Sequence, residues 1–148
     1  MLPPLDAATG NLPAGIHEAT WEELASAFGT TPWRAELLAG LRAALEALRL
    51  AGCRRAYVDG SFVTAKEAPG DFDGCWEPQG VDPDRLDPVL LDFQHPRRAQ
   101  KEKFRGELFI ADWGADSAGT RFLEFFQIDK VTGEPKGIAA IDLVKELK

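Results

Sequence analysis

Residues Tyr57–Trp76 read YVDGSFVTAKEAPGDFDGCW, and the rest of the chain is best understood outward from this stretch. An apolar run typical of a β-strand leads into the turn Gly60-Ser61, and the stretch closes with Asp71 and Asp73, one residue apart. A turn that can hold a phosphate is therefore followed by two carboxylates that can hold a metal ion. No other part of the sequence combines these two features.

The same stretch predicts a run of short elements. Cys53–Asp59 has the composition of a strand that enters the Gly-Ser turn, and Phe62–Glu67 can form a short helix. Pro69-Gly70 would end that helix, and Phe72–Trp76 is the next expected strand.

The two aspartates predict a cation site. Side chains alternate between the faces of a strand, so Asp71 and Asp73 are expected on one face, where they repel each other unless a cation lies between them. Mg²⁺ suits such a site, because it prefers oxygen ligands and is commonly shared between carboxylates and substrate phosphates.

The turn before the predicted short helix is the expected phosphate site. Gly60 lets backbone approach a ligand closely, and the Ser61 hydroxyl can donate a hydrogen bond to it. Lys66, one turn further on, can also reach a phosphate, although a solvated helix lysine is the more common explanation.

Two helices are expected before this stretch. Residues 1–15 are rich in proline and glycine and predict an extended N-terminal arm, followed by a single domain over 16–148. Thr20 and Glu23 form a capping-box pattern for a helix over Trp21–Phe28. Thr31-Pro32 then starts an amphipathic helix with leucines at spacings of three or four, which should end near Gly52.

The second half of the chain predicts further mixed structure. Val89–Phe93 can be strand or helix, Pro96–Phe104 favours a helix, and Leu108–Ala111 favours a strand. Phe122–Ile128 and Ile138–Val144 are expected to pair as a C-terminal β-hairpin. The predicted class is α+β (mixed α/β), with a small mixed sheet flanked by helices.

Composition excludes several classes of protein. The 148 residues carry a formal net charge of -7, so stable binding to DNA by phosphate neutralisation is not expected, although the run from Arg97 to Arg105 is locally basic. The sequence shows no signal peptide and no apolar stretch that could span a membrane, which predicts a cytoplasmic protein. Cys53 and Cys75 are expected to be free, buried thiols, and no zinc-binding pattern is present.

The spacing Gly60-Ser61, nine residues, then Asp71-Phe72-Asp73 resembles the signature of the nucleotidyltransferase superfamily, which has the DNA polymerase β-like fold. Small bacterial nucleotidyltransferase-like proteins carry a similar Asp-Gly-Ser-Phe-Val-Thr segment. The resemblance is strong over Tyr57–Trp76 and extends in outline over Thr31–Ala111. Gly74 departs from the pattern, which usually has an apolar residue after the aspartate pair.

The resemblance implies a nucleoside triphosphate (NTP) donor, two Mg²⁺ ions, and transfer of a nucleoside monophosphate to a hydroxyl group of a protein, RNA or small molecule. Gly60 and Ser61 would hold the triphosphate, while Asp71 and Asp73 would bind metal. The superfamily also uses a third carboxylate to activate the acceptor hydroxyl. Three residues are candidates for it, in this order of preference: Glu107, Asp92 and Asp112.

Small free-standing members of the superfamily occur in bacterial toxin–antitoxin pairs, where the partner protein or tRNA is often the acceptor, and the resemblance makes this one setting to consider. Two alternatives remain open from the sequence. One is a catalytically inactive nucleotidyltransferase fold that binds or regulates a partner. The other is a phosphate-binding protein outside the superfamily, in which Asp71 and Asp73 are incidental.

Overall fold

The computed structural model describes residues 2–93 and 98–147, and its centre is one five-stranded sheet. The strands are β1 (Gly15–Ala19), β2 (Arg55–Asp59), β3 (Phe72–Trp76), β4 (Gly106–Ile110) and β5 (Gly137–Asp142). Their order across the sheet is β1-β5-β2-β3-β4. β2 runs antiparallel to both of its neighbours, whereas β1 is parallel to β5 and β3 is parallel to β4.

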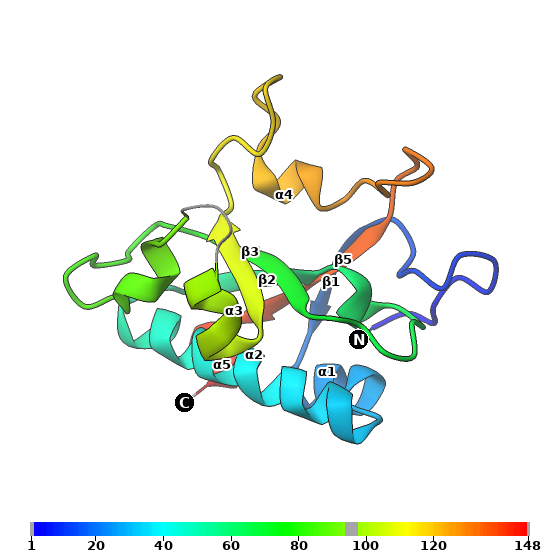
Figure 1. Ribbon diagram of the computed structural model, residues 1–148, viewed down its shortest axis with the longest axis horizontal. Helices are drawn as coiled ribbons and strands as arrows, with labels where there is room; N and C mark the ends of the chain where they lie inside the picture. Colours follow the sequence, from blue (N-terminus) through cyan, green and yellow to red (C-terminus); the bar gives the residue numbers. More distant parts are fainter. Residues whose placement is uncertain (1, 94–97, 148) are drawn as a thin grey trace.

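Helices lie on both faces of this sheet, but unequally (Figure 1). α1 (Trp21–Phe28), α2 (Pro32–Leu50), α3 (Arg98–Phe104) and α5 (Leu143–Glu146) lie on one side, which we call the helical face. Of the described α-helices, only α4 (Phe122–Phe125) lies on the other side, which we call the α4 face. The predicted mixed α+β class is therefore confirmed. None of the described helices has the length and apolar character needed to cross a membrane.

Strand alternation gives each face its own apolar cluster. The helical face buries Val58, Phe72, Trp76 and Leu108 against α1 and α2. The α4 face buries a smaller, mostly aromatic cluster that includes Tyr57, Cys75, Phe109 and Phe126. Because side chains two residues apart share a face, Asp73 lies on the α4 face beside Cys75, and Glu107 lies there beside Phe109.

The first two helices have the predicted bounds and caps. The Thr20 side chain accepts from the Glu23 amide at 3.0 Å, and the Glu23 carboxylate accepts from the Thr20 amide at 3.2 Å. Thr31 caps α2 by accepting from the amide of Arg34 at 3.1 Å. The apolar stripe of α2 is fully buried, which makes this helix the main support beneath the sheet.

The predicted C-terminal hairpin is wrong. Phe122–Phe125 is a helical turn rather than a strand, because its rings pack against one another and against Phe109. Ile128 forms an isolated antiparallel bridge with Pro135, which lies in the loop before β5 and outside the second predicted segment. The second segment instead forms β5, which lies between β1 and β2 with Ile138 and Ile141 fully buried on opposite faces.

The region around the Gly-Ser turn also differs from expectation. The helix predicted over Phe62–Glu67 is absent; one 3-10 turn, Ser61–Val63, is followed by irregular chain. Arg34 holds this segment by donating to the carbonyls of Phe62 at 2.6 Å and Thr64 at 2.9 Å, and also to that of Lys66. These backbone carbonyls therefore accept hydrogen bonds from a buried guanidinium rather than from the amides of a helix.

In three other segments the structure agrees in part with the predicted elements. Val89–Phe93, left open between strand and helix, overlaps a 3-10 turn over Pro88–Leu91. The helix expected from Pro96 is present as α3 from Arg98, and Pro96 and Arg97 lie outside the described residues. Residues 2–14 contain neither a helix nor a strand, as expected of the arm, yet Leu12 is buried in the core. Strand β1, which follows directly, was not predicted.

Candidate functional site

The strand register brings three acidic residues to one place on the α4 face. Asp73 of β3 pairs directly with Glu107 of β4, and Asp71 lies just before β3. We call Asp71, Asp73 and Glu107 the carboxylate cluster. Directly paired residues in neighbouring strands have side chains close enough to interact. Of the three candidates for the third carboxylate, Glu107 is therefore the one that the fold places beside the aspartates.

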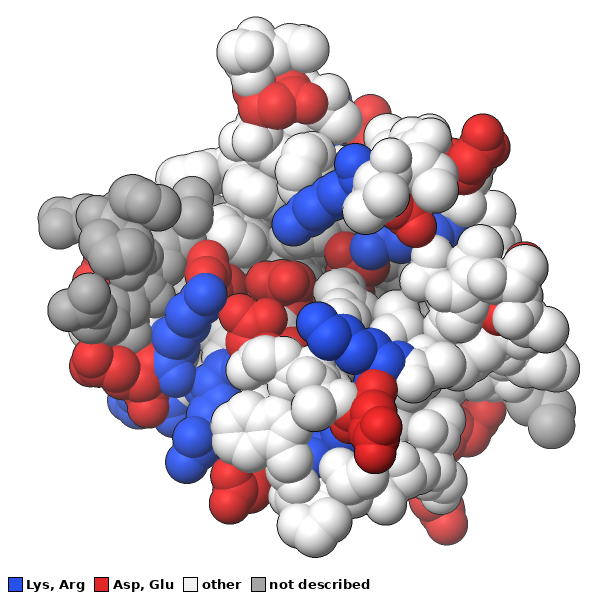
Figure 2. Space-filling view, turned by 45° about the vertical axis from the view of Figure 1, so that its right-hand side comes forward, with Lys and Arg blue, Asp and Glu red and all other residues white. Residues whose placement is uncertain are grey.

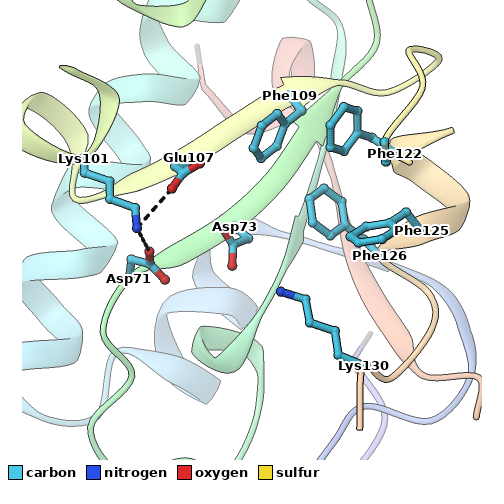
Figure 3. Close-up of a pocket in the computed structure, with 10 residues that line it drawn as sticks. Asp71, Asp73, Lys101, Glu107, Phe109, Phe122, Phe125, Phe126 and Lys130 are labelled. Carbon is cyan, nitrogen blue, oxygen red and sulfur yellow. Dashed lines mark ion pairs between the residues drawn. The ribbon is translucent and has the colours of Figure 1, made fainter. Parts of the chain in front are cut away.

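Lys101 of α3 is shared by two members of the cluster. Its ammonium nitrogen lies 3.2 Å from Oδ2 of Asp71 and 3.1 Å from Oε1 of Glu107, as the dashed lines in Figure 3 show. The two carboxylates raise the pKa of Lys101, chiefly through the hydrogen bonds it donates to Glu107 and then Asp71. A positive charge thus already occupies the point between two of the acids.

The turn at Gly60 lies directly against the Asp73 carboxylate of the cluster. Gly60 has φ 81° and ψ -173°, a conformation that is nearly restricted to glycine. A Cβ at this position would lie 2.8 Å from Oδ2 of Asp73, closer than real side-chain contacts allow. The glycine therefore serves the site by letting the turn come against the Asp73 carboxylate.

A fourth carboxylate, that of Asp59, lies beside the cluster on the neighbouring strand β2. Asp59 is 4% exposed and pairs across the sheet with Asp73. It forms an ion pair with Lys136, whose ammonium lies 3.1 Å from Oδ1 of Asp59. Burial raises the pKa of Asp73 to about 7, with Asp71, Asp59 and Glu107 adding to the shift through repulsion and Lys130 opposing it. Among the described residues of the site, four carboxylates outnumber three lysines: Lys101, Lys130 and Lys136.

The cluster opens into a cavity of about 440 Å³ with two chemically different sides. The carboxylate cluster and Lys101 form one side, and four phenylalanines form the other, which we call the aromatic wall: Phe109, Phe122, Phe125 and Phe126. Phe109 and Phe122 are stacked with ring centroids 4.3 Å apart. In Figure 3 the Lys130 side chain reaches toward Asp73 from the loop after the wall. Figure 2 shows acidic side chains gathered in the hollow, with basic side chains beside them.

The donor set suits a divalent ion that brings other ligands with it. Within residues 2–93 and 98–147, no three His, Cys, Asp or Glu side chains are already arranged as a metal site. Mg²⁺ does not need such a cage, since it usually binds one or two carboxylates together with water and substrate phosphates. The ammonium held between Asp71 and Glu107 shows that this point attracts positive charge. The cluster therefore offers carboxylate oxygens of the kind that Mg²⁺ binds, without a complete set of protein ligands among the described residues.

The remaining sequence candidates do not line the cavity. Lys66 lines a separate surface pocket with Arg34 and Thr64, away from the carboxylate cluster. Asp112 is exposed and Asp92 half-buried, and neither lines the cavity. Ser61 begins the 3-10 turn, where its carbonyl accepts from the Thr64 hydroxyl at 2.7 Å.

Several residues of the site were not predicted from the sequence as site residues. Asp59 lies directly before the turn and two residues after Tyr57 in the same strand. Side chains two residues apart share a face, so the sequence pattern could have placed Asp59 on the same face as Tyr57. Lys130 and the other three phenylalanines of the aromatic wall, Phe122, Phe125 and Phe126, had no such signal, because their segment was interpreted as a hairpin. Lys101 stood in a basic run, which more often marks a solvated helix face.

Comparison with known proteins places the chain in a family. Residues 3–142 match the model of a family described as a family of unknown function, DUF6932. The chain belongs to this family. No curated protein and no solved structure matches it. The DUF6932 match covers the arm, the Gly-Ser turn, the carboxylate cluster and the aromatic wall, so all parts of the candidate site lie within the family domain.

Proposed function

We propose that this DUF6932 protein is a Mg²⁺-dependent nucleotidyltransferase that moves a nucleoside monophosphate from an NTP to a hydroxyl group of a protein, RNA or small molecule. One observation carries the proposal. Asp71, Asp73 and Glu107, which the sequence separates by up to 36 positions, come together in one cavity beside the Gly60 turn. That combination suits phosphoryl chemistry, in which the protein mainly positions groups and neutralises charge.

Each group in the cavity has a role in this chemistry. Asp71 and Asp73 would hold the metal, and two Mg²⁺ ions, when bound, would neutralise the triphosphate and lower the pKa of the attacking hydroxyl. Glu107 would take the proton of the acceptor hydroxyl, and its position on the next strand, facing the same cavity, supports this role. Lys130 reaches into the cavity and is suited to a phosphate oxygen.

The aromatic wall supports a substrate with a flat ring. Nucleic-acid bases stack on aromatic side chains with little dependence on base identity. Four phenylalanines opposite a carboxylate cluster therefore suit a molecule with an aromatic end and a phosphate end. Gly60 and Ser61 would meet the phosphate end through the turn itself, since the helix that was expected to follow them is only a 3-10 turn.

The test is a transfer assay with each of the four NTPs carrying an α-phosphate label, Mg²⁺, and extract as the source of acceptor. We expect label on a macromolecule or small acceptor with the wild-type protein, and loss of at least about a hundredfold in rate for Asp71→Asn and Asp73→Asn. Asp112→Asn is the matched control, because this exposed aspartate lies outside the cavity. Equal transfer by the wild type and both cavity variants would refute the mechanism.

A catalytically inactive regulatory module is the second candidate, and Lys101 is the observation that favours it. Its ammonium lies between Asp71 and Glu107, where a cation would be needed. An inactive module would bind nucleotide without transferring label. A role in a toxin–antitoxin pair is compatible with either function, and co-expression growth assays with neighbouring genes would test it.

A further inference from the structure

We propose that Lys101 is a resident counter-ion that a divalent cation must displace before the site can act. The inference rests on the proposed metal site and adds a positioning residue to it. In the metal-free protein the ammonium neutralises Asp71 and Glu107; when metal binds, Lys101 leaves them. Lys101 therefore sets the metal concentration at which the site fills.

The position of Lys101 is fixed by its neighbours in the fold. Gln100 is fully buried, and its side-chain carbonyl accepts from the Leu108 amide at 2.9 Å, which ties α3 to β4. Arg105, with φ 68°, then turns the chain directly from α3 into β4. Lys101 and Glu107 are thus presented to the same cavity by a tight helix-to-strand connection.

Lys101 is nevertheless free to move at its tip. Its side chain is 51% exposed, whereas that of Glu107 is 13% exposed. A lysine has a long flexible stem and binds as a point charge, so its ammonium can swing to solvent without moving the helix. The carboxylates are held by paired strands or lie next to them, so the lysine is the partner that yields.

The balance of charge in the cavity explains why a divalent ion can displace the Lys101 ammonium. The cavity is lined by three carboxylates and two lysines, and the nearby Lys136 is already paired with Asp59. Counted over these described lining residues, Lys101 and Lys130 therefore offset the three carboxylates only in part. A compact ion of charge two, bound directly to carboxylate oxygens, neutralises them more completely.

The test measures binding of Mn²⁺ alone, by electron paramagnetic resonance, without nucleotide. Lys101→Met removes the competing charge, and we expect it to bind Mn²⁺ about tenfold more tightly than the wild type. Lys103→Met is the matched control, because Lys103 lies on the same helix but pairs with Asp87 outside the cavity. It should leave Mn²⁺ affinity unchanged.

A second readout uses stability. Metal-free Lys101→Met should melt below the wild type, because the carboxylates lose their counter-ion, and Mg²⁺ should raise its melting temperature more than that of the wild type. Lys101→Gln, which keeps a polar donor of neutral charge, serves if the methionine variant does not fold. A merely structural role for Lys101 would not tighten metal binding.

The outcomes separate this inference from the proposed function. If the wild type binds Mn²⁺ and Asp73→Asn weakens it, but Lys101→Met binds no more tightly, the exchange is refuted while the metal site stands. If neither the wild type nor Lys101→Met binds Mn²⁺ at millimolar concentration, the exchange is refuted; if Mn²⁺ still fails to bind when an NTP is added, the metal site is refuted with it.

Discussion

Gly60→Ala is the substitution that most directly tests how the turn and the carboxylate cluster depend on each other. The backbone of Gly60, at φ 81° and ψ -173°, lies where other residues are strained by about 1–3 kcal/mol. The added Cβ would also lie 2.8 Å from Oδ2 and 3.2 Å from Cβ of Asp73. Since Asp73 is held in a paired strand, its carboxylate would have to rotate away from the turn.

We expect the two effects together to destabilise the protein by at least about 2 kcal/mol. For a chain of this size that corresponds to a fall in Tm of about 4–8 °C. Urea unfolding followed by circular dichroism measures the loss, and Mn²⁺ binding reports whether the carboxylate has moved. Metal affinity should fall, because the displaced Asp73 no longer faces Asp71 and Glu107 in the same way.

Gly119→Ala separates strain from contact. Gly119 has the same φ of 81° but nothing within 4 Å of its would-be Cβ, so alanine there should cost stability without changing metal binding. Gly70→Ala, with no positive φ and no close neighbour, should be nearly neutral. If Gly60→Ala and Gly119→Ala lose the same stability and both keep wild-type metal affinity, the contact with Asp73 has no role.

Three further predictions follow from buried groups. Arg34→Met should destabilise the fold by about 3 kcal/mol in urea unfolding, because this 4%-exposed guanidinium donates to several carbonyls and no described acid pairs with it; a loss below about 1 kcal/mol would contradict this. In metal-free buffer, the free energy of unfolding should fall as pH rises from about 4 to about 7, because the pKa of Asp73 is raised from 3.8 to about 7 and its protonated form favours the folded state. Asp73→Asn should flatten this pH dependence of stability. An unchanged dependence would refute the assignment of the effect to Asp73. Burial raises the pKa of Cys53 to about 11 and that of Cys75 further, so a thiol reagent at pH 8 should modify neither until the protein unfolds; rapid modification of the folded protein would show that the burial is wrong.

The elements predicted correctly are those specified by local chemistry. Caps and an apolar stripe define α1 and α2, and glycine and proline residues flank β3. The ends of these three elements could therefore be predicted from neighbouring residues. Glu107 was also accessible, because a helix between two strands usually makes them parallel neighbours, and parallel register then places Glu107 opposite Asp73.

The errors arose where distant contacts decide the structure. Phe122–Phe125 has the composition of a strand, but its rings pack on Phe109 from another strand and on one another, which favours a helical turn. Phe62–Glu67 has the composition of a helix, but Arg34 of α2 bonds its carbonyls instead. Neither partner is visible in the local sequence, and the lysines of the cavity were missed for the same reason.

Gly74, which departs from the nucleotidyltransferase pattern, has a physical explanation in this fold. A Cβ on Gly74 would lie 2.1 Å from the Tyr57 carbonyl oxygen and 3.0 Å from Cδ2 of Leu108. An apolar side chain there would force β2 and β3 apart, and the pairing of Asp59 with Asp73 depends on those two strands. The missing side chain is therefore a consequence of close strand packing on the helical face and has no bearing on whether the α4 face is active.

The charge of the cavity favours a site that is completed by a ligand over a purely structural cluster. A structural cluster gains most when each buried charge has a partner, because an uncompensated one is costly. Here Asp59 has Lys136, and Asp71 and Glu107 share Lys101. Asp73 has Lys130 near it, yet burial and repulsion from three other carboxylates still raise its pKa to about 7. The fold thus holds Asp73 in an unfavourable place that a cation would relieve. Lys101 already supplies positive charge to Asp71 and Glu107, where it would compete with such a cation, and its removal should therefore tighten metal binding rather than abolish it.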